Sequence, residues 1–252
     1  MIRLLSILSI MFMISCYSVL SDFEEIDEIL SYNYYLDQGW NAFETINLSS
    51  IDSTENINHS EYYDLALEMF NISILSIDDE FQQQNFMGPY YKSYNGLGWT
   101  YLYYAGEFLE PSNNDIRDSL RNQSVLYFDS ALTSLNNSLS EDISSQDWCD
   151  TYLGLSYTHY YRGLDNSNYF DSTLFYSELL INEKPYYNFY HDELNYKNVH
   201  YLRGKIYLIK ELYDEAYNEI QNSIEGCNPY IDDELNIELL LECFDRFANG
   251  NE

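Results

Sequence analysis

The chain has 252 residues, of which 42 are acidic and only 11 are basic, so its formal net charge is −31. Such a field repels nucleic acid and anionic lipid headgroups, and nucleic acid is therefore excluded as a partner. The charge favours a cationic partner, divalent cations or simply solubility at high salt, and composition does not separate these alternatives. With 46% hydrophobic residues, the chain is not of the disordered class and is long enough to bury one core.

The amino-terminal segment predicts export. Arg3 is followed by an apolar run over residues 4–14, which is too short to span a bilayer and is typical of a signal peptide. Ser15 and Cys16 come next, and with Met13 they resemble the bacterial lipobox, in which a small residue precedes the cysteine that becomes lipidated. Met13 stands where the lipobox usually has leucine. An ordinary signal peptide with an incidental cysteine is the alternative.

This resemblance implies three segments. Residues 1–15 are expected to be a lipoprotein signal peptide, residues 16–30 a lipidated tether or the start of the first helix, and residues 31–252 a helical repeat domain. Lipid on Cys16 would hold the protein on a membrane of a bacterial cell envelope. The periplasmic and surface sides are both open to it.

Glycine-centred motifs recur along the rest of the chain and predict pairs of helices. The clearest motif, YNGLGWTY, spans residues 94–101 with Gly98 near its centre. Shorter copies surround Gly39, Gly154 and Gly204. These motifs resemble the first helix of the tetratricopeptide repeat, W-x2-L-G-x2-Y, with tyrosine in the place of the tryptophan.

A second helix is expected after each motif. Ala66 with Phe70, and Phe128 with Ala131, fit the small and aromatic pattern of the family's second helix. The glycine is expected to let the two helices of a pair cross closely, with the small residue of the second helix against it. Extra polar residues between the helices of the first two pairs depart from the family's spacing.

The end of the chain is typical of a capping helix. Asp232 and Asp233 offer an N-cap, and Leu239, Phe244 and Phe247 lie on one apolar face of the predicted helix. The resemblance therefore implies an all-α fold, an α-solenoid of about four tetratricopeptide-like helix hairpins with a C-terminal capping helix. A looser family of helical hairpins is the alternative.

Three cysteines remain when Cys16 is assigned to lipid, namely Cys149, Cys227 and Cys243. This odd number argues against a disulfide framework, and at most one pair can form. Cys227 and Cys243 are the nearer pair in sequence, while buried free thiols are the default state of cysteines on helices. The sequence contains no CxxC motif and no Cys/His cluster, so no zinc site is expected.

The sequence contains no motif that carries catalysis. It has no P-loop, no G-x-S-x-G, no H-E-x-x-H and no G-x-G-x-x-G before a helix. Acidic runs at residues 78–80 and 232–234 lack the alternating ligand spacing of a calcium loop and suit helix N-termini better. We therefore expect no enzymatic activity, no cofactor and no metal ion.

The resemblance also implies where a partner binds. In tetratricopeptide proteins, the residue after the glycine and those four and five after the glycine face a concave groove. The partner-binding residues expected on this basis are Trp40, Phe43, Trp99, Leu102, Tyr103, Leu155, His159, Lys205 and Leu208. Two tryptophans at the equivalent position can form an exposed interface hot spot, or they can be buried between neighbouring units, and the sequence leaves both open.

These features predict a non-enzymatic envelope lipoprotein that acts as a protein–protein interaction scaffold through its groove. Its partner is expected to be a protein or peptide segment, and it contacts the membrane through the N-terminal lipid. The alternative is a carbohydrate- or nutrient-binding surface lipoprotein, similar to helical-repeat glycan binders, which would stack a glycan on Trp and Tyr rings. Proteins of that kind are usually longer than this chain.

The lipid anchor is tested by metabolic labelling with a fatty-acid analogue in a bacterial host. We expect the wild-type chain to incorporate the label and Cys16→Ala to lose it, because the thiol of Cys16 is the group that takes the lipid. Cys149→Ala is the control and should stay labelled. If the wild-type protein stays unlabelled, the prediction of a lipid anchor is wrong.

Overall fold

Helices make up most of the part of the chain that the computed structural model describes, which is residues 31–51, 59–81, 89–138, 143–224 and 226–249. The prediction of an all-α fold is confirmed for this part. Two 3-10 turns, η1 (Pro111–Asn113) and η2 (Ser167–Tyr169), precede α5 and α7, and strands β1 (Tyr230–Ile231) and β2 (Glu234–Leu235) form a hairpin. The α-helices are α2 (Tyr32–Ile51), α3 (His59–Phe81), α4 (Tyr90–Gly106), α5 (Asn114–Asn137), α6 (Ser145–Asp165), α7 (Phe170–Glu183), α8 (Tyr196–Ile209), α9 (Tyr213–Ile220) and α10 (Ile237–Ala248).

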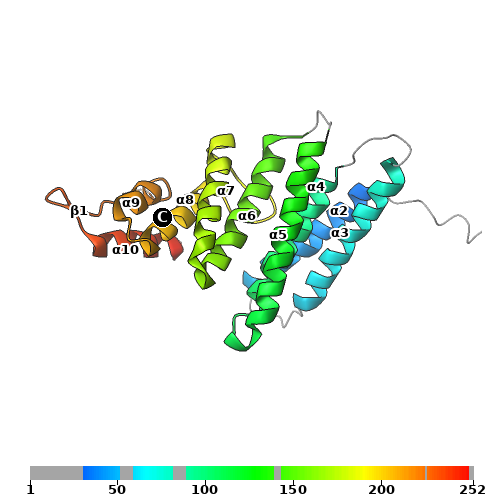
Figure 1. Cartoon of the computed structure of the whole chain (residues 1–252), viewed down its shortest axis with the longest axis horizontal. Helices are drawn as coiled ribbons and strands as arrows, with labels where there is room; N and C mark the ends of the chain where they lie inside the picture. Colours follow the sequence, from blue (N-terminus) through cyan, green and yellow to red (C-terminus); the bar gives the residue numbers. More distant parts are fainter. Residues whose placement is uncertain (1–30, 52–58, 82–88, 139–142, 225, 250–252) are drawn as a thin grey trace, which may run out of the picture.

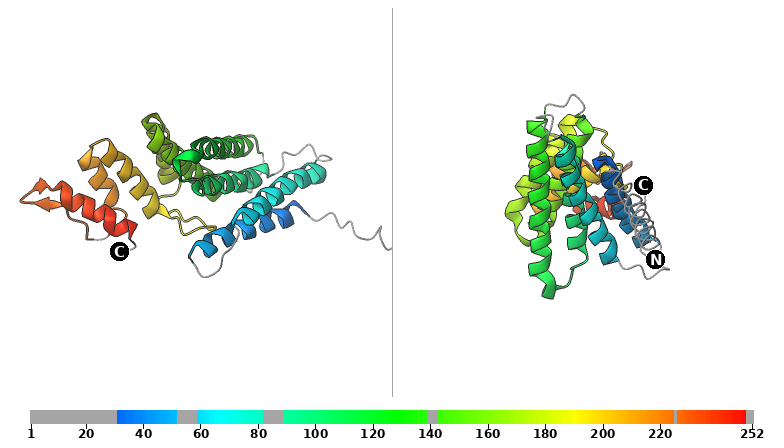
Figure 2. Two further views of the ribbon diagram at one scale, coloured as in Figure 1. Left: turned by 90° about the horizontal axis from the view of Figure 1, so that it is seen from below. Right: turned by 90° about the vertical axis from the view of Figure 1, so that its right-hand side faces the viewer.

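Successive helices pack against one another along the length of the molecule (Figures 1 and 2). Helix α2 packs on α3, α4 on α5, α6 on α7 and α8 on α9, and each pair contacts the next. Helices α2, α4, α6 and α8 also contact one another in that order, so they share one surface. We call the part of this surface formed by α2, α4 and α6 the inner face.

Two phenylalanines set the spacing of the first three pairs. The ring of Phe70 on α3 lies against both Gly39 on α2 and Gly96 on α4. The ring of Phe128 on α5 lies in the same way against glycines of α4 and α6, and a Cβ built on Gly154 would be 2.1 Å from its Cζ atom. The glycines therefore accommodate an aromatic ring, where the sequence predicted a small residue of the second helix.

Helices α4 and α6 share a local pattern that puts them in register. The hydroxyl of Thr100 donates to the carbonyl oxygen of Gly96 at 2.8 Å, and the hydroxyl of Thr158 donates to that of Gly154 at the same distance. Both threonines are fully buried, so these bonds satisfy hydroxyls that water cannot reach. Gly96 and Gly154 are therefore equivalent positions of the two helices.

The C-terminal part has its own apolar core, formed mainly by α9 and α10. A disulfide joins Cys227 to Cys243 and ties the segment after α9 to α10, while Cys149 is a buried free thiol. Asp232 and Asp233 were expected to cap the last helix, but they have positive φ angles and form the turn between β1 and β2. The side chain of Asn236 caps α10 instead, because it accepts a hydrogen bond from the backbone N–H of Leu239.

Cys16 and the predicted signal peptide lie outside the residues that the structure describes. Among the described helices, none combines the length and the apolar character that a membrane span requires.

The contact between glycine and phenylalanine predicts how substitutions act. Gly154→Ala should lower the free energy of unfolding by about 1–3 kcal/mol, because its methyl group would overlap the buried ring of Phe128. Gly106→Ala is the matched control, since a Cβ at that position meets no atom within 4 Å. Urea unfolding followed by circular dichroism measures both, and equal stability of the two variants would contradict this account of the packing.

Candidate functional site

The loop between α7 and α8, residues 184–195, lies across the inner face (Figure 2). It forms a narrow hairpin, because the N–H of Phe189 donates to the carbonyl of Leu194 and the N–H of Tyr196 donates to that of Tyr187, each at 2.8 Å. Tyr187 and Phe189 are buried and belong to the main core, while Tyr186 and Tyr190 are exposed. The loop is therefore part of the packed structure and not a solvated connection.

Two rings of this loop cover the tryptophans of the inner face. The Phe189 ring stacks on Trp99, with 4.6 Å between ring centroids, and meets Trp40 edge-on at 6.2 Å. The His191 ring stacks on Trp40 at 3.7 Å, and its Nδ1 atom forms a 2.8 Å hydrogen bond with the carboxylate of Glu44. Burial lowers the pKa of His191, although Glu44 opposes this shift. Both tryptophans are consequently buried.

Polar contacts hold the two ends of the loop. The Tyr103 hydroxyl on α4 donates to the carboxylate of Asp192. The Tyr187 hydroxyl donates to Oδ1 of Asp150 on α6 at 2.5 Å, and Gln146 also donates to this oxygen. Burial raises the pKa of the Asp150 carboxyl to about 7, and both hydrogen bonds oppose the rise.

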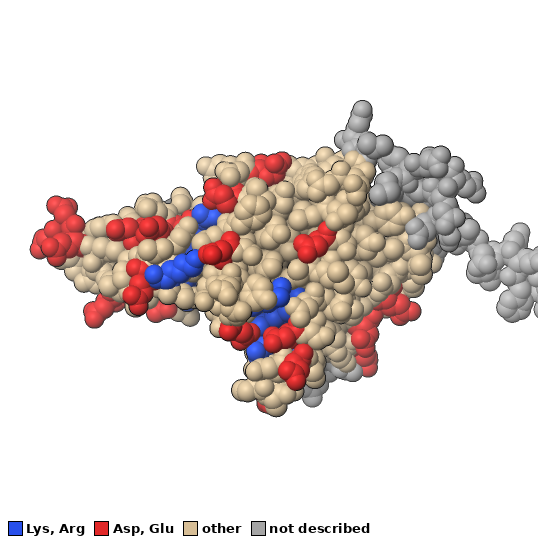
Figure 3. All heavy atoms as spheres, in the orientation of Figure 1, with Lys and Arg blue, Asp and Glu red and all other residues tan. Residues whose placement is uncertain are grey.

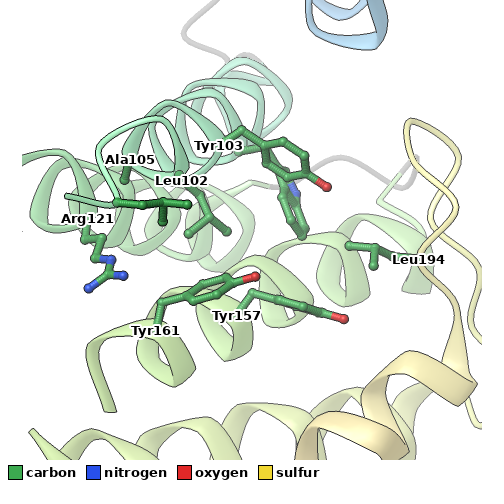
Figure 4. Close-up of a pocket in the computed structure, with 10 residues that line it drawn as sticks. Leu102, Tyr103, Ala105, Arg121, Tyr157, Tyr161 and Leu194 are labelled. Carbon is green, nitrogen blue, oxygen red and sulfur yellow. The ribbon is translucent and has the colours of Figure 1, made fainter. Parts of the chain in front are cut away.

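A pocket of about 370 Å³ lies beside the loop, between α4 and α6 (Figure 4). At its rim, the side chain of Leu109 is 73% exposed and that of Tyr161 is 39% exposed. Apolar and aromatic groups line most of its wall, which is typical of binding pockets. The lining residues are Trp99, Leu102, Tyr103, Ala105, Gly106, Leu109, Arg121, Tyr157, Tyr161 and Leu194.

Two of the residues that line the pocket, Arg121 and Trp99, carry nitrogen donors. The Arg121 guanidinium lies 5.7 Å from the ring centroid of Tyr161 and pairs with the carboxylate of Asp165 at 2.6 Å. The Nε1 atom of Trp99 is fully buried and has no hydrogen-bond partner among the described residues. A buried N–H without an acceptor is costly, but this atom has no exposed surface, so a ligand in the pocket does not reach it.

Charge does not single out another site. Acidic side chains are spread over the face shown in Figure 3, and the basic ones lie beside them. Within the described part of the chain, no group of three or more His, Cys, Asp or Glu side chains is arranged to hold a metal ion.

The residues predicted to bind a partner have different surroundings. Trp99, Leu102 and Tyr103 come together in the pocket wall. Trp40 and Phe43 lie in the core, where the loop covers Trp40 and Phe43 contacts the ring of Tyr103.

Leu155 and His159 lie on another side of α6. Because Gly154 is equivalent to Gly96, the residue equivalent to Trp99 is Tyr157, and that equivalent to Tyr103 is Tyr161. Leu155 and His159 each lie two residues before these equivalent positions. Two residues correspond to a rotation of about 200° around a helix, so the predicted side chains face away from the pocket. Leu155 is fully buried, and His159 stacks on Tyr176 of α7.

The last two predicted residues belong to the C-terminal part. Leu208 packs against the core formed by α9 and α10, and the Nζ atom of Lys205 lies 5.9 Å from the ring centroid of Tyr201. Burial lowers the pKa of His159 to about 4, with a smaller effect from Arg162, so this histidine is neutral at pH 7. None of these three side chains lines the pocket.

The sequence argument missed Tyr157 and the whole α7–α8 loop. The available signal was the aromatic density of residues 186–190, YYNFY, which is unusual for a connection between two helices. Comparisons with protein-family models, with characterised proteins and with solved structures give no match.

The buried carboxyl of Asp150 predicts a specific pH dependence. Since its pKa is raised from 3.8 to about 7 in the folded chain, the folded state holds a proton that the unfolded state releases between about pH 4 and 7. Stability should therefore fall as pH rises through this window. Asp150→Asn keeps the acceptor for Tyr187 but cannot ionise, so its stability should fall less.

Urea unfolding at pH 5 and at pH 8 measures this difference. Asp64→Asn, at an exposed position of α3, is the charge-matched control. Equal changes for the two variants would contradict the assignment to Asp150.

Proposed function

We propose that this chain is a non-enzymatic, lipid-anchored protein of a bacterial cell envelope that binds a segment of a partner protein on its inner face. The observation that carries the proposal is the pocket between α4 and α6. Its wall combines Trp99, Leu102 and Tyr103 of α4 with Tyr157 and Tyr161 of α6, which are equivalent positions of neighbouring helices. These are the positions that face the partner in the tetratricopeptide family.

Packing supports a tetratricopeptide-like solenoid of about four hairpins with α10 as its cap. A glycine of the first helix lies against a ring of the following helix in the first two pairs, at Gly39 and Gly98. Gly204 of α8 lies against the ring of Phe244, which comes from α10. Helix α10 packs on both α8 and α9, as a capping helix does.

Two features support the envelope as the location. Ser15 and Cys16 resemble a lipobox, and Cys227 is joined to Cys243 in a disulfide. Disulfides persist in exported proteins because the cytosol keeps most thiols reduced.

The shape of the site favours a protein segment over a glycan. At about 370 Å³, the pocket is at the lower end of the range for ligand pockets, about 300–1,000 Å³, and suits one or two side chains. A glycan platform needs an exposed aromatic face, and Phe189 covers the indole of Trp99. Bound apolar side chains in a desolvated aromatic pocket are typical of interface hot spots.

Selection from a display library of random dodecapeptides on the chain from residue 17 onward tests the proposal. We expect the selected peptides to bind about tenfold or more weakly to Leu109→Asp, because a charge at the rim must lose water when the pocket fills. Fluorescence anisotropy of labelled peptides measures the affinity.

The matched control is Leu75→Asp, since Leu75 is also strongly exposed but lies on α3 and does not line the pocket. Its affinity should equal that of the wild type. Peptides that bind Leu109→Asp as tightly as the wild type would place the binding site elsewhere, and hits confined to a glycan array would favour the alternative.

A further inference from the structure

Phe189 covers the contact between α2 and α4, and this arrangement indicates what the open pocket between α4 and α6 binds. We propose that the pocket between α4 and α6 takes an aromatic side chain of the partner segment. This inference rests on the proposed function and names the chemistry of the partner.

The inner face contains two equivalent lines of contact between neighbouring helices, which we call seams. Gly39 and Gly98 each lie against the ring from the helix that follows, so Trp40 and Trp99 occupy the same position of α2 and α4. The paired threonine bonds give Tyr157 the same position on α6. The seam of α2 and α4 therefore presents Trp40 and Trp99, and the seam of α4 and α6 presents Trp99 and Tyr157.

The first seam is filled by a ring of the chain itself. Phe189 lies over this seam, stacked on Trp99 with 26° between the ring planes and edge-on to Trp40 with 77°. Its side chain is only 1% exposed. These offset and edge-on arrangements are the favoured geometries of aromatic pairs, because the positive edge of one ring meets the negative face of another.

The second seam has the same kind of wall, and no ring from the described part of the chain lies over it. Tyr103, Tyr157 and Tyr161 surround the open volume, and Leu194 of the loop forms its edge next to the filled seam (Figure 4). Leu194 follows Phe189 across the hairpin of the loop, so the loop ends where the open pocket begins. An aromatic side chain in this pocket would continue the row of rings that Phe189 and His191 start.

The experiment uses 19F NMR of the chain from residue 17 onward labelled with 5-fluorotryptophan, which reports on Trp40, Trp99 and Trp148 separately. The probes are N-acetylphenylalaninamide, N-acetylleucinamide and toluene, each added into the millimolar range. We expect the phenylalanine amide to shift the Trp99 signal saturably and to bind about threefold to tenfold more tightly than the leucine amide. Toluene should also shift the Trp99 signal, because the ring is the group that the pocket takes.

Controls separate the pocket from other effects. The Trp148 signal should not move, because Trp148 does not line the pocket. Tyr161→Leu keeps an apolar wall but removes a ring, and it should reduce the preference for the phenylalanine amide. Tyr190→Leu changes an exposed ring of the loop outside the pocket and should leave the preference unchanged.

Two results would overturn this inference without touching the proposed function. One is a leucine amide that binds as tightly as the phenylalanine amide. The other is a Trp99 signal that no probe shifts, while peptides selected on the wild type still lose affinity for Leu109→Asp. Toluene that leaves the Trp99 signal unshifted, while the phenylalanine amide shifts it, would overturn the role of the ring. Insensitivity of the selected peptides to Leu109→Asp is the separate result that removes the proposed function itself.

Discussion

The position of two buried phenyl rings determines the rest of this structure. Phe70 and Phe128 each lie against glycines of two different helices, so one side chain sets the distance of its own helix to both neighbours. No other residue type leaves room for the ring at these positions, because any Cβ would overlap it. This spacing brings α2, α4 and α6 side by side, and Trp40, Trp99 and Tyr157 then occupy equivalent positions on a common surface.

The inner face shows why a repeated helical surface need not be a continuous open groove. The α7–α8 loop supplies Phe189 and His191 to the tryptophans of α2 and α4, and it is held by Asp150 and Tyr103. Large aromatic rings that are close together are strongly driven out of water, so a loop with suitable rings covers them. The face is thereby divided into a part that the loop covers and a part between α4 and α6 that contains an open pocket.

Which residues of this pocket the sequence predicts depends on how the repeats are aligned. The motif of α4 contains two glycines, Gly96 and Gly98, and each lies against a different phenyl ring. The corresponding motif of α6 has only Gly154, because Ser156 stands where α4 has Gly98. Matching Gly154 to Gly98 instead of Gly96 shifts every assignment by two residues. The α4 residues consequently fall in the pocket wall, whereas Leu155 and His159 do not, and Tyr157 and Tyr161 stand in their place. The hydrogen bonds of the two threonines fix this register, and so do the rings of Phe70 and Phe128 against Gly96 and Gly154.

The sequence by itself determined that the described chain is helical, because aromatic and aliphatic residues recur with helical spacing and few glycines or prolines interrupt them. The tertiary structure alone decided which tryptophans are covered, where the open pocket lies and which cysteines are joined. The physical reason is the range of the interactions. Helix formation depends on neighbours a few residues apart, whereas Trp40 and His191 meet across 150 residues of chain, and no local pattern carries that contact.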